Sequence, residues 1–88
     1  MMPSYLETLF WDINVDTFQP EAYPEYTISR VLEYGDEAAV AWLREIFPQY
    51  EIRKVLCTEQ RLSRKSANFW AIILGVPSHE VAALKPSQ

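Results

Sequence analysis

The sequence predicts an all-α fold, a compact single-domain bundle of about five to six short helices with a helix-turn-helix-like C-terminal part. Along most of the 88 residues, apolar side chains recur three and four positions apart, which is the period of an amphipathic helix. The only two glycines, Gly35 and Gly75, each follow such a segment, where a helix C-terminal cap is expected. Prolines at positions 20, 24, 48 and 77 fall where segments begin, because proline disrupts a helix interior.

We expect one domain over residues 1–88, made of an N-terminal helix and arm (1–24), a helical core (25–60) and a helix-turn-helix-like unit (61–85). Ser4 is a suitable N-cap for a short helix that starts at Tyr5. The apolar residues that follow, up to Phe18, are expected to form an irregular arm that crosses the bundle. Residues 19–24 form a linker.

The core part contains three predicted helices, over residues 25–34, 37–47 and 48 to about 59. Asp36 directly follows Gly35 and is a good N-cap for the second of these helices. A Gly-Asp pair between two amphipathic segments predicts a tight turn that joins antiparallel helices.

A further helix is expected from the N-cap Ser63 to Leu74. It is apolar nearly all round from Phe69 onward, which predicts that it is the central and most buried element. In this interpretation Phe69 and Trp70 fill the core on two sides of the helix.

The spacing from Ala71 to Gly75, Val81 and Leu84 is that of a helix-turn-helix. Glycine supplies the positive φ of a tight turn, and two apolar residues three apart on a second helix pack back onto the first. We therefore expect a last short helix over about residues 78–84.

The net charge of −4 is unevenly distributed. Residues 1–52 hold ten acidic and two basic residues, a net charge of −8, whereas residues 53–88 hold six basic and two acidic residues, a net charge of +4. A basic end of this kind is typical of a surface that binds nucleic acid or an acidic protein. The alternative is that the two oppositely charged regions attract each other within the fold. Six residues are candidates for contact with nucleic acid or an acidic partner: Arg53, Lys54, Arg61, Arg64, Lys65 and Asn68.

The sequence leaves two roles open for Asn68. Its side chain forms a hydrogen bond with the backbone of a neighbouring loop, or it belongs to a binding surface beside Arg64. The predicted last helix carries no arginine at its outward positions, and Glu80 there disfavours phosphate. The basic residues before it are of the kind that contacts the phosphate backbone of a nucleic acid without recognising its base sequence.

The residue inventory argues against an enzyme. The chain has one histidine, one cysteine and no glycine-rich loop, so a phosphate cradle is not expected, and a Cys57–His79 pair would lack an orienting third group. Asp12, Asn14 and Asp16 have the spacing that begins a calcium loop, but Thr17 and Tyr23 stand where glycine and glutamate are needed. We expect turns there, and neither a metal nor a cofactor.

The single cysteine, Cys57, excludes an internal disulfide and a cysteine-based zinc site, which suits a reducing compartment. The sequence also has no apolar run of membrane-spanning length. A cytoplasmic protein that does not bind membranes is therefore expected.

Several phrases together resemble a known family of small helical bacterial proteins of unknown function. They are Leu9-Phe10-Trp11-Asp12, Arg30-Val31-Leu32-Glu33 with Gly35-Asp36, Trp42-Leu43, Arg61-Leu62-Ser63, Lys65-Ser66-Ala67-Asn68-Phe69-Trp70 and Gly75-Val76-Pro77. Members are often encoded beside nucleotidyltransferase toxins of the abortive-infection type. The family has no established catalytic residues, so the resemblance implies a non-enzymatic partner or an antitoxin-like role.

The sequence thus favours a protein-interaction module whose partner is a protein, with an antitoxin-like role implied by the resemblance. Such a module would use exposed aromatic side chains of the N-terminal arm or the basic residues above. The aromatic candidates are Tyr5, Phe10, Trp11 and Phe18. The alternative is a DNA-binding helix-turn-helix regulator built on residues 63–84. Nothing in the sequence indicates the oligomeric state.

Overall fold

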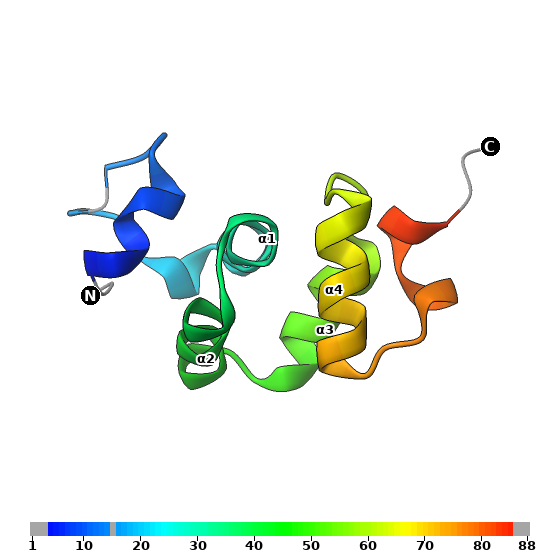
Figure 1. The fold of residues 1–88 in the computed structure, drawn as a ribbon. Helices are drawn as coiled ribbons and strands as arrows, with labels where there is room; N and C mark the ends of the chain where they lie inside the picture. The colour runs from blue at the N-terminus through cyan, green and yellow to red at the C-terminus, as the bar shows by residue number, and fades with distance from the viewer. Residues whose placement is uncertain (1–3, 15, 86–88) are drawn as a thin grey trace.

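The computed structural model describes residues 4–14 and 16–85, and within them the regular structure is entirely helical, as the sequence predicts. Four α-helices form the body of the molecule (Figure 1): α1 (Pro24–Tyr34), α2 (Glu37–Ile46), α3 (Gln49–Thr58) and α4 (Arg64–Leu74). Short 3₁₀ segments flank them: η1 (Ser4–Phe10), η2 (Pro20–Ala22), η3 (Ser78–Glu80) and η4 (Ala82–Leu84).

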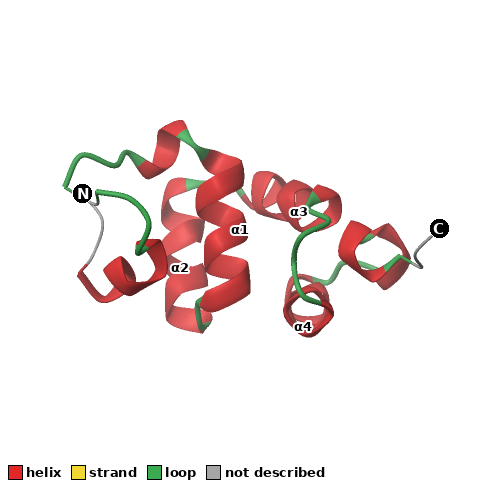
Figure 2. Ribbon diagram, turned by 90° about the horizontal axis from the view of Figure 1, so that it is seen from above, coloured by secondary structure: helices red, strands yellow, loops and turns green. Residues whose placement is uncertain are grey.

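Helix α1 is the central element. It contacts α2, α3, α4, η1 and η2, and its Ile28 and Val31 are fully buried. Figure 2 shows α1 and α2 side by side, with α3 and α4 beyond them and the first and last described segments, η1 and η4, at opposite ends of the molecule. One cluster of buried apolar side chains runs from Leu6 in η1 to Val81, so the described chain shares a single core.

The prediction that α4 is the most buried helix is wrong. Its inward face is covered by α1, α3 and η4, but Phe69, Ile72 and Ile73 lie on the opposite side and are 47%, 72% and 41% exposed. Trp70 does fill the core, whereas Phe69 does not. The apolar composition of α4 therefore reflects two different faces, of which only one is covered within the chain.

Local signals set the ends of α1 and α2 as expected. Asp36 caps α2, because its carboxylate accepts a hydrogen bond from the Ala39 N–H at 3.0 Å. Gly35 ends α1 in an extended conformation, with a φ of −88°. A Cβ atom at this position would lie 2.7 Å from the Val31 carbonyl oxygen and 2.9 Å from Ala39 Cβ. Glycine is needed here because α1 and α2 approach each other closely, and a positive φ plays no part.

Helix α4 is bounded by the two residues that the sequence indicates. The Ser63 hydroxyl accepts a hydrogen bond from the Ser66 N–H at 3.1 Å, and Gly75 adopts the left-handed conformation with a φ of +70°. Arg53 of α3 reaches the end of α4, where its guanidinium donates to the Leu74 carbonyl oxygen at 2.9 Å.

The expected last helix is not continuous. Two three-residue 3₁₀ segments replace it, separated by Val81 in an extended conformation. Val81 is fully buried, Ala71 is 3% exposed and η4 contacts α4, so the chain turns back onto α4 after Gly75, but the second helix of a helix-turn-helix is not formed. A seven-residue helix has little stability of its own, and here the burial of Val81 decides the backbone path instead.

The N-terminal arm folds against α1. Leu6 and Phe10 of η1 are buried there, and the arm stays at the α1–α2 end of the molecule rather than crossing the bundle (Figure 1). The Asn14 side chain accepts a hydrogen bond from the Asp16 N–H at 3.0 Å, which is the turn expected in place of a calcium loop.

Candidate protein-interaction surface

Two of the six candidate basic-region residues have structural partners. Arg53 caps the C-terminal end of α4. Arg61 forms a two-pronged ion pair with Glu59, with Nε to Oε1 at 2.9 Å and a terminal nitrogen to Oε2 at 3.0 Å. This pair lowers the pKa of Glu59 and raises the pKa of Arg61. Both arginines are exposed, and each also has a partner within the chain.

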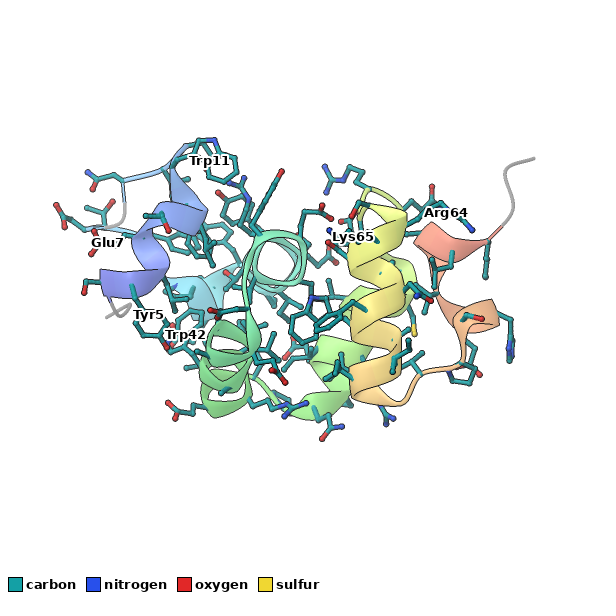
Figure 3. The ribbon with its side chains drawn as sticks, viewed as in Figure 1. Tyr5, Glu7, Trp11, Trp42, Arg64 and Lys65 are labelled. Atoms are coloured by element: carbon teal, nitrogen blue, oxygen red, sulfur yellow. The ribbon has the colours of Figure 1, made fainter. Side chains whose placement is uncertain are left out.

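The exposed start of α4 holds three more of these candidates. Arg64 and Lys65 lie in its first turn, on two sides of the helix (Figure 3), and Asn68 follows one turn later. Toward the other described residues, none of the three forms an ion pair or a side-chain hydrogen bond. Asn68 therefore belongs to the exposed surface, and of its two interpretations the loop hydrogen bond is not formed. Lys54, the sixth candidate, is exposed on α3.

The outward face of α4 joins these polar residues to an apolar stripe. Lys65, Phe69 and Ile72 are spaced four and three residues apart, which aligns them along one side of a helix. Ile73 and Asn68 flank them. We call this set the α4 outer face: Lys65, Asn68, Phe69, Ile72 and Ile73. Sequence reasoning missed its apolar part, because an apolar period looks the same whether the chain itself or a partner covers it.

The aromatic candidates of the N-terminal arm differ in burial. Tyr5 and Trp11 are exposed, at 57% and 63%. Phe10 is only 1% exposed, and its ring lies 5.4 Å from that of the half-buried Phe18. The expectation that Phe10 is an exposed contact is therefore wrong, since its position on η1 directs it into the core against α1.

Trp11, although exposed, belongs to a cluster centred on Arg30. The Arg30 guanidinium lies 4.5 Å from the centre of the Trp11 ring and 4.8 Å from that of Tyr26. It also pairs with both carboxylate oxygens of Asp12, at 2.8 and 3.2 Å. A further hydrogen bond goes to the Leu9 carbonyl oxygen at 3.2 Å. We call this cluster the Arg30 clamp, because it fastens the arm to α1.

The clamp changes the acidity of its carboxylate. The hydrogen bonds from Arg30 and from the Tyr26 hydroxyl, the latter at 2.7 Å, lower the pKa of Asp12 from 3.8 to about 2. Both stabilise the charged form. Asp12 therefore has structural partners in Arg30 and Tyr26.

Side chains of α4 and the residue before it complete the end of α1. The Trp70 indole N–H donates to the Leu32 carbonyl oxygen at 2.7 Å, and the Ser66 hydroxyl donates to that of Glu33 at 3.2 Å. In return, the Glu33 carboxylate accepts a hydrogen bond from the Ser63 N–H at 2.8 Å. These bonds satisfy polar groups that the end of α1 and the start of α4 leave unpaired.

This junction accounts for five of the nine residues from Leu62 to Trp70. These five are capping, hydrogen-bonding or buried residues: Leu62, Ser63, Ser66, Ala67 and Trp70. Phe69 has a partial structural role, since its half-exposed ring stands edge-on to that of Trp70 with 4.7 Å between the ring centres. Lys65 and Asn68 have no ion pair or side-chain hydrogen bond with other described residues, and all three lie on the α4 outer face. Beside them is a hollow between α1 and α4, lined in part by Leu32, Glu33, Lys65, Phe69 and Trp70.

Cys57 and His79 are the residues considered for catalysis. His79 is exposed, 3.7 Å from Glu80, and burial raises the pKa of the half-buried Cys57 thiol, which opposes its use as a nucleophile. Among residues 4–14 and 16–85, no three histidine, cysteine, aspartate or glutamate side chains are grouped as metal ligands would be. The helices of the described chain are also too short or too polar to span a bilayer.

Comparison with known proteins yields one match. A family model described as a family of unknown function (DUF6922) matches residues 5–56. This range contains the Arg30 clamp and ends before α4. Neither a curated protein nor a solved structure matches the chain.

Proposed function

The chain belongs to DUF6922, a family of unknown function, and we propose that it is a non-enzymatic protein-interaction module that binds a protein partner through the α4 outer face. The observation that carries this proposal is the exposure of Phe69, Ile72 and Ile73 next to each other on one helix. Single exposed apolar residues are ordinary on a protein surface, but a contiguous set marks an interaction site.

A protein suits this face better than DNA does. Phosphate groups and base edges present charge and hydrogen-bonding groups, whereas the middle of the face is aliphatic and aromatic. The segment after Gly75 has only three-residue turns, which are too short to lie in a major groove as a recognition helix does. Arg53 and Arg61 are held by groups of the chain itself.

We infer the finer role, an antitoxin-like partner of a nucleotidyltransferase toxin in the cytoplasm, from the resemblance of the sequence motifs. The test is co-expression of the tagged protein with the product of the neighbouring gene, followed by size-exclusion chromatography with light scattering. A stoichiometric complex is the expected result. A chain that stays monomeric and retains no partner contradicts the module itself.

The role of α4 is tested in the same experiment with two matched variants. Ile72→Glu places a charge in the middle of the outer face, and Tyr50→Glu places the same charge at an exposed aromatic residue on α3. We expect Ile72→Glu to abolish the complex and Tyr50→Glu to leave it intact. Equal loss in both variants, or in neither, contradicts the assignment of the binding surface to α4.

DNA binding is the second candidate, because Arg64, Lys65 and Asn68 are exposed together at the start of α4. Arginine, lysine and asparagine are side chains that contact phosphates and base edges. A titration with duplex DNA over a series of salt concentrations decides this case, since phosphate contacts make affinity fall steeply with salt. The absence of binding at low salt excludes this candidate.

A further inference from the structure

The charge and shape of the α4 outer face point to the kind of partner segment that covers it. Resting on the proposed function above, we propose that this segment is an amphipathic helix of net negative charge. It lies along α4 with its apolar side on Phe69 and Ile72 and places one apolar side chain in the hollow beside Trp70. Figure 3 shows α4 at the front of the molecule, with its outward side unobstructed by other elements.

The form of the surface favours a helix. The outer face is a stripe along an 11-residue helix, roughly 16 Å long at 1.5 Å per residue. A helix with apolar residues three and four positions apart covers such a stripe, and a partner of about three turns has the matching length. The lining of the hollow at its side includes the apolar side chains of Leu32, Phe69 and Trp70 together with polar residues, and its apolar part suits an aliphatic or aromatic anchor.

The surrounding charges favour an acidic partner. Helix α4 has no acidic residue, and Arg64 and Lys65 begin it. At its other end lies the Arg53 guanidinium, which bonds to the Leu74 carbonyl oxygen. The acidic residue beside the hollow is Glu33, whose carboxylate accepts a hydrogen bond from the Ser63 N–H and keeps its negative charge. We therefore expect the acidic residues of the partner segment to lie toward Arg64 and Lys65 and its apolar anchor to lie at the hollow. Opposite charges across an interface set partner choice and orientation.

A second copy of this chain fits the face poorly. If two α4 helices pack in parallel, Lys65 of one copy faces Lys65 of the other. If they pack antiparallel, Lys65 faces the end where Arg53 of the other copy lies. Both arrangements bring positive charges together in a partly apolar contact, where like charges are costly. The partner segment therefore comes from a different protein.

The test uses a display library of random peptides of about 18 residues, roughly five helical turns. The library is selected on the immobilised full chain, with removal of peptides that also bind the Ile72→Glu variant. We expect enriched sequences with apolar residues three and four apart and an excess of aspartate and glutamate. The best peptide, made synthetically, becomes the probe for affinity measurements and for helix formation followed by circular dichroism.

Three variants make the affinity measurement specific. Ile72→Glu is expected to weaken peptide binding about tenfold or more, as the loss of a central apolar contact does. The double variant Arg64→Glu, Lys65→Glu is expected to weaken it about fivefold or more at low salt, with a smaller effect in high salt. Tyr50→Glu, the matched control, is expected to bind as the wild type does.

Four outcomes overturn the proposal: no enrichment, enriched peptides that are neutral or basic, a bound peptide without helix, and affinities that the charge reversal leaves unchanged. A wild-type dimer that Ile72→Glu dissolves also overturns it and assigns the face to a second copy. If neutral or basic peptides bind and compete with the co-expressed partner, the proposal of an acidic helix is wrong, but the proposed protein-interaction function is retained. Failure of the function itself appears separately, as the loss of every complex in the co-expression experiment.

Discussion

The Arg30 clamp and the α4 outer face are two regions of one small molecule with exposed apolar side chains, and they differ in what those side chains contact. Trp11 is 63% exposed, but its ring packs against the Arg30 guanidinium and, 5.1 Å away between centres, against Tyr34. Ile72 is 72% exposed on the face of α4 turned away from the core. Exposure alone therefore does not identify a docking residue, because an exposed ring with a structural partner already has a role.

Substitutions in the clamp, on the inward side of α4 and on its outer face test this comparison. The largest effect is expected for Trp70→Ala on the inward side of α4. It removes a side chain that is 2% exposed together with its hydrogen bond to the Leu32 carbonyl oxygen. We expect the free energy of unfolding, measured in urea, to fall by about 3–5 kcal/mol. Trp70→Phe keeps most of the ring volume and should cost less; an equal cost for both variants contradicts the role of packing.

A smaller loss is expected when the clamp is opened by Arg30→Ala. This variant removes the contacts to the Trp11 ring, to Asp12 and to the Leu9 carbonyl oxygen. Charge-assisted hydrogen bonds and a cation–π contact together suggest a cost of about 1–3 kcal/mol. The intrinsic fluorescence of the exposed Trp11 should change even in the folded state. Unfolding in urea and emission spectra measure these two effects, and an unchanged spectrum would show that the clamp does not hold the arm.

The clamp should also make stability depend on pH. The pKa of Asp12 is lowered to about 2 in the fold, from an ordinary 3.8. A carboxylate whose pKa is lowered by folding stabilises the protein above its unfolded pKa, and this contribution is lost as the pH falls toward the folded value. We therefore expect the stability difference between the wild type and Asp12→Asn to shrink from pH 4 to pH 2. Thermal unfolding across this range measures it, and a constant difference argues against the ion pair.

The smallest effect on stability is expected on the outer face of α4. Ile72→Glu changes a residue that is already exposed, so the free energy of unfolding should move by no more than about 0.5 kcal/mol. The same variant should abolish the complex. Trp70 and Ile72 lie two residues apart on one helix, and we expect the first substitution to affect the fold and the second to affect binding. A loss of several kcal/mol for Ile72→Glu would show that the outer face is part of the core.

Local rules made much of this fold predictable from sequence. Asp36 and Ser63 cap helices because a side-chain oxygen next to a free backbone N–H needs no distant partner. Gly75 turns the chain at a positive φ, which few other residues adopt. Such signals depend on neighbours in the chain, and these are what a sequence displays.

Features that depend on distant residues were not predictable in the same way. Phe10 and Phe69 both lie in apolar segments, yet one is buried and the other is exposed, because α1 covers η1 while nothing in the described chain covers the outer side of α4. The sequence also places Arg53 and Arg61 among the candidate binding residues, because it shows their charge but not the groups that they contact in the fold. Their structural partners, the end of α4 and Glu59, become visible only when side-chain positions are known.

The way α4 completes α1 has a consequence for synthesis on the ribosome. The last carbonyl groups of α1 find their hydrogen bonds in Ser66 and Trp70, which lie 33 and 38 positions further along the chain. A nascent chain that has reached only α3 therefore exposes the apolar side of its central helix and leaves those carbonyl groups to water. We therefore expect α1 to reach its full stability only after α4 has been synthesised and has packed against it.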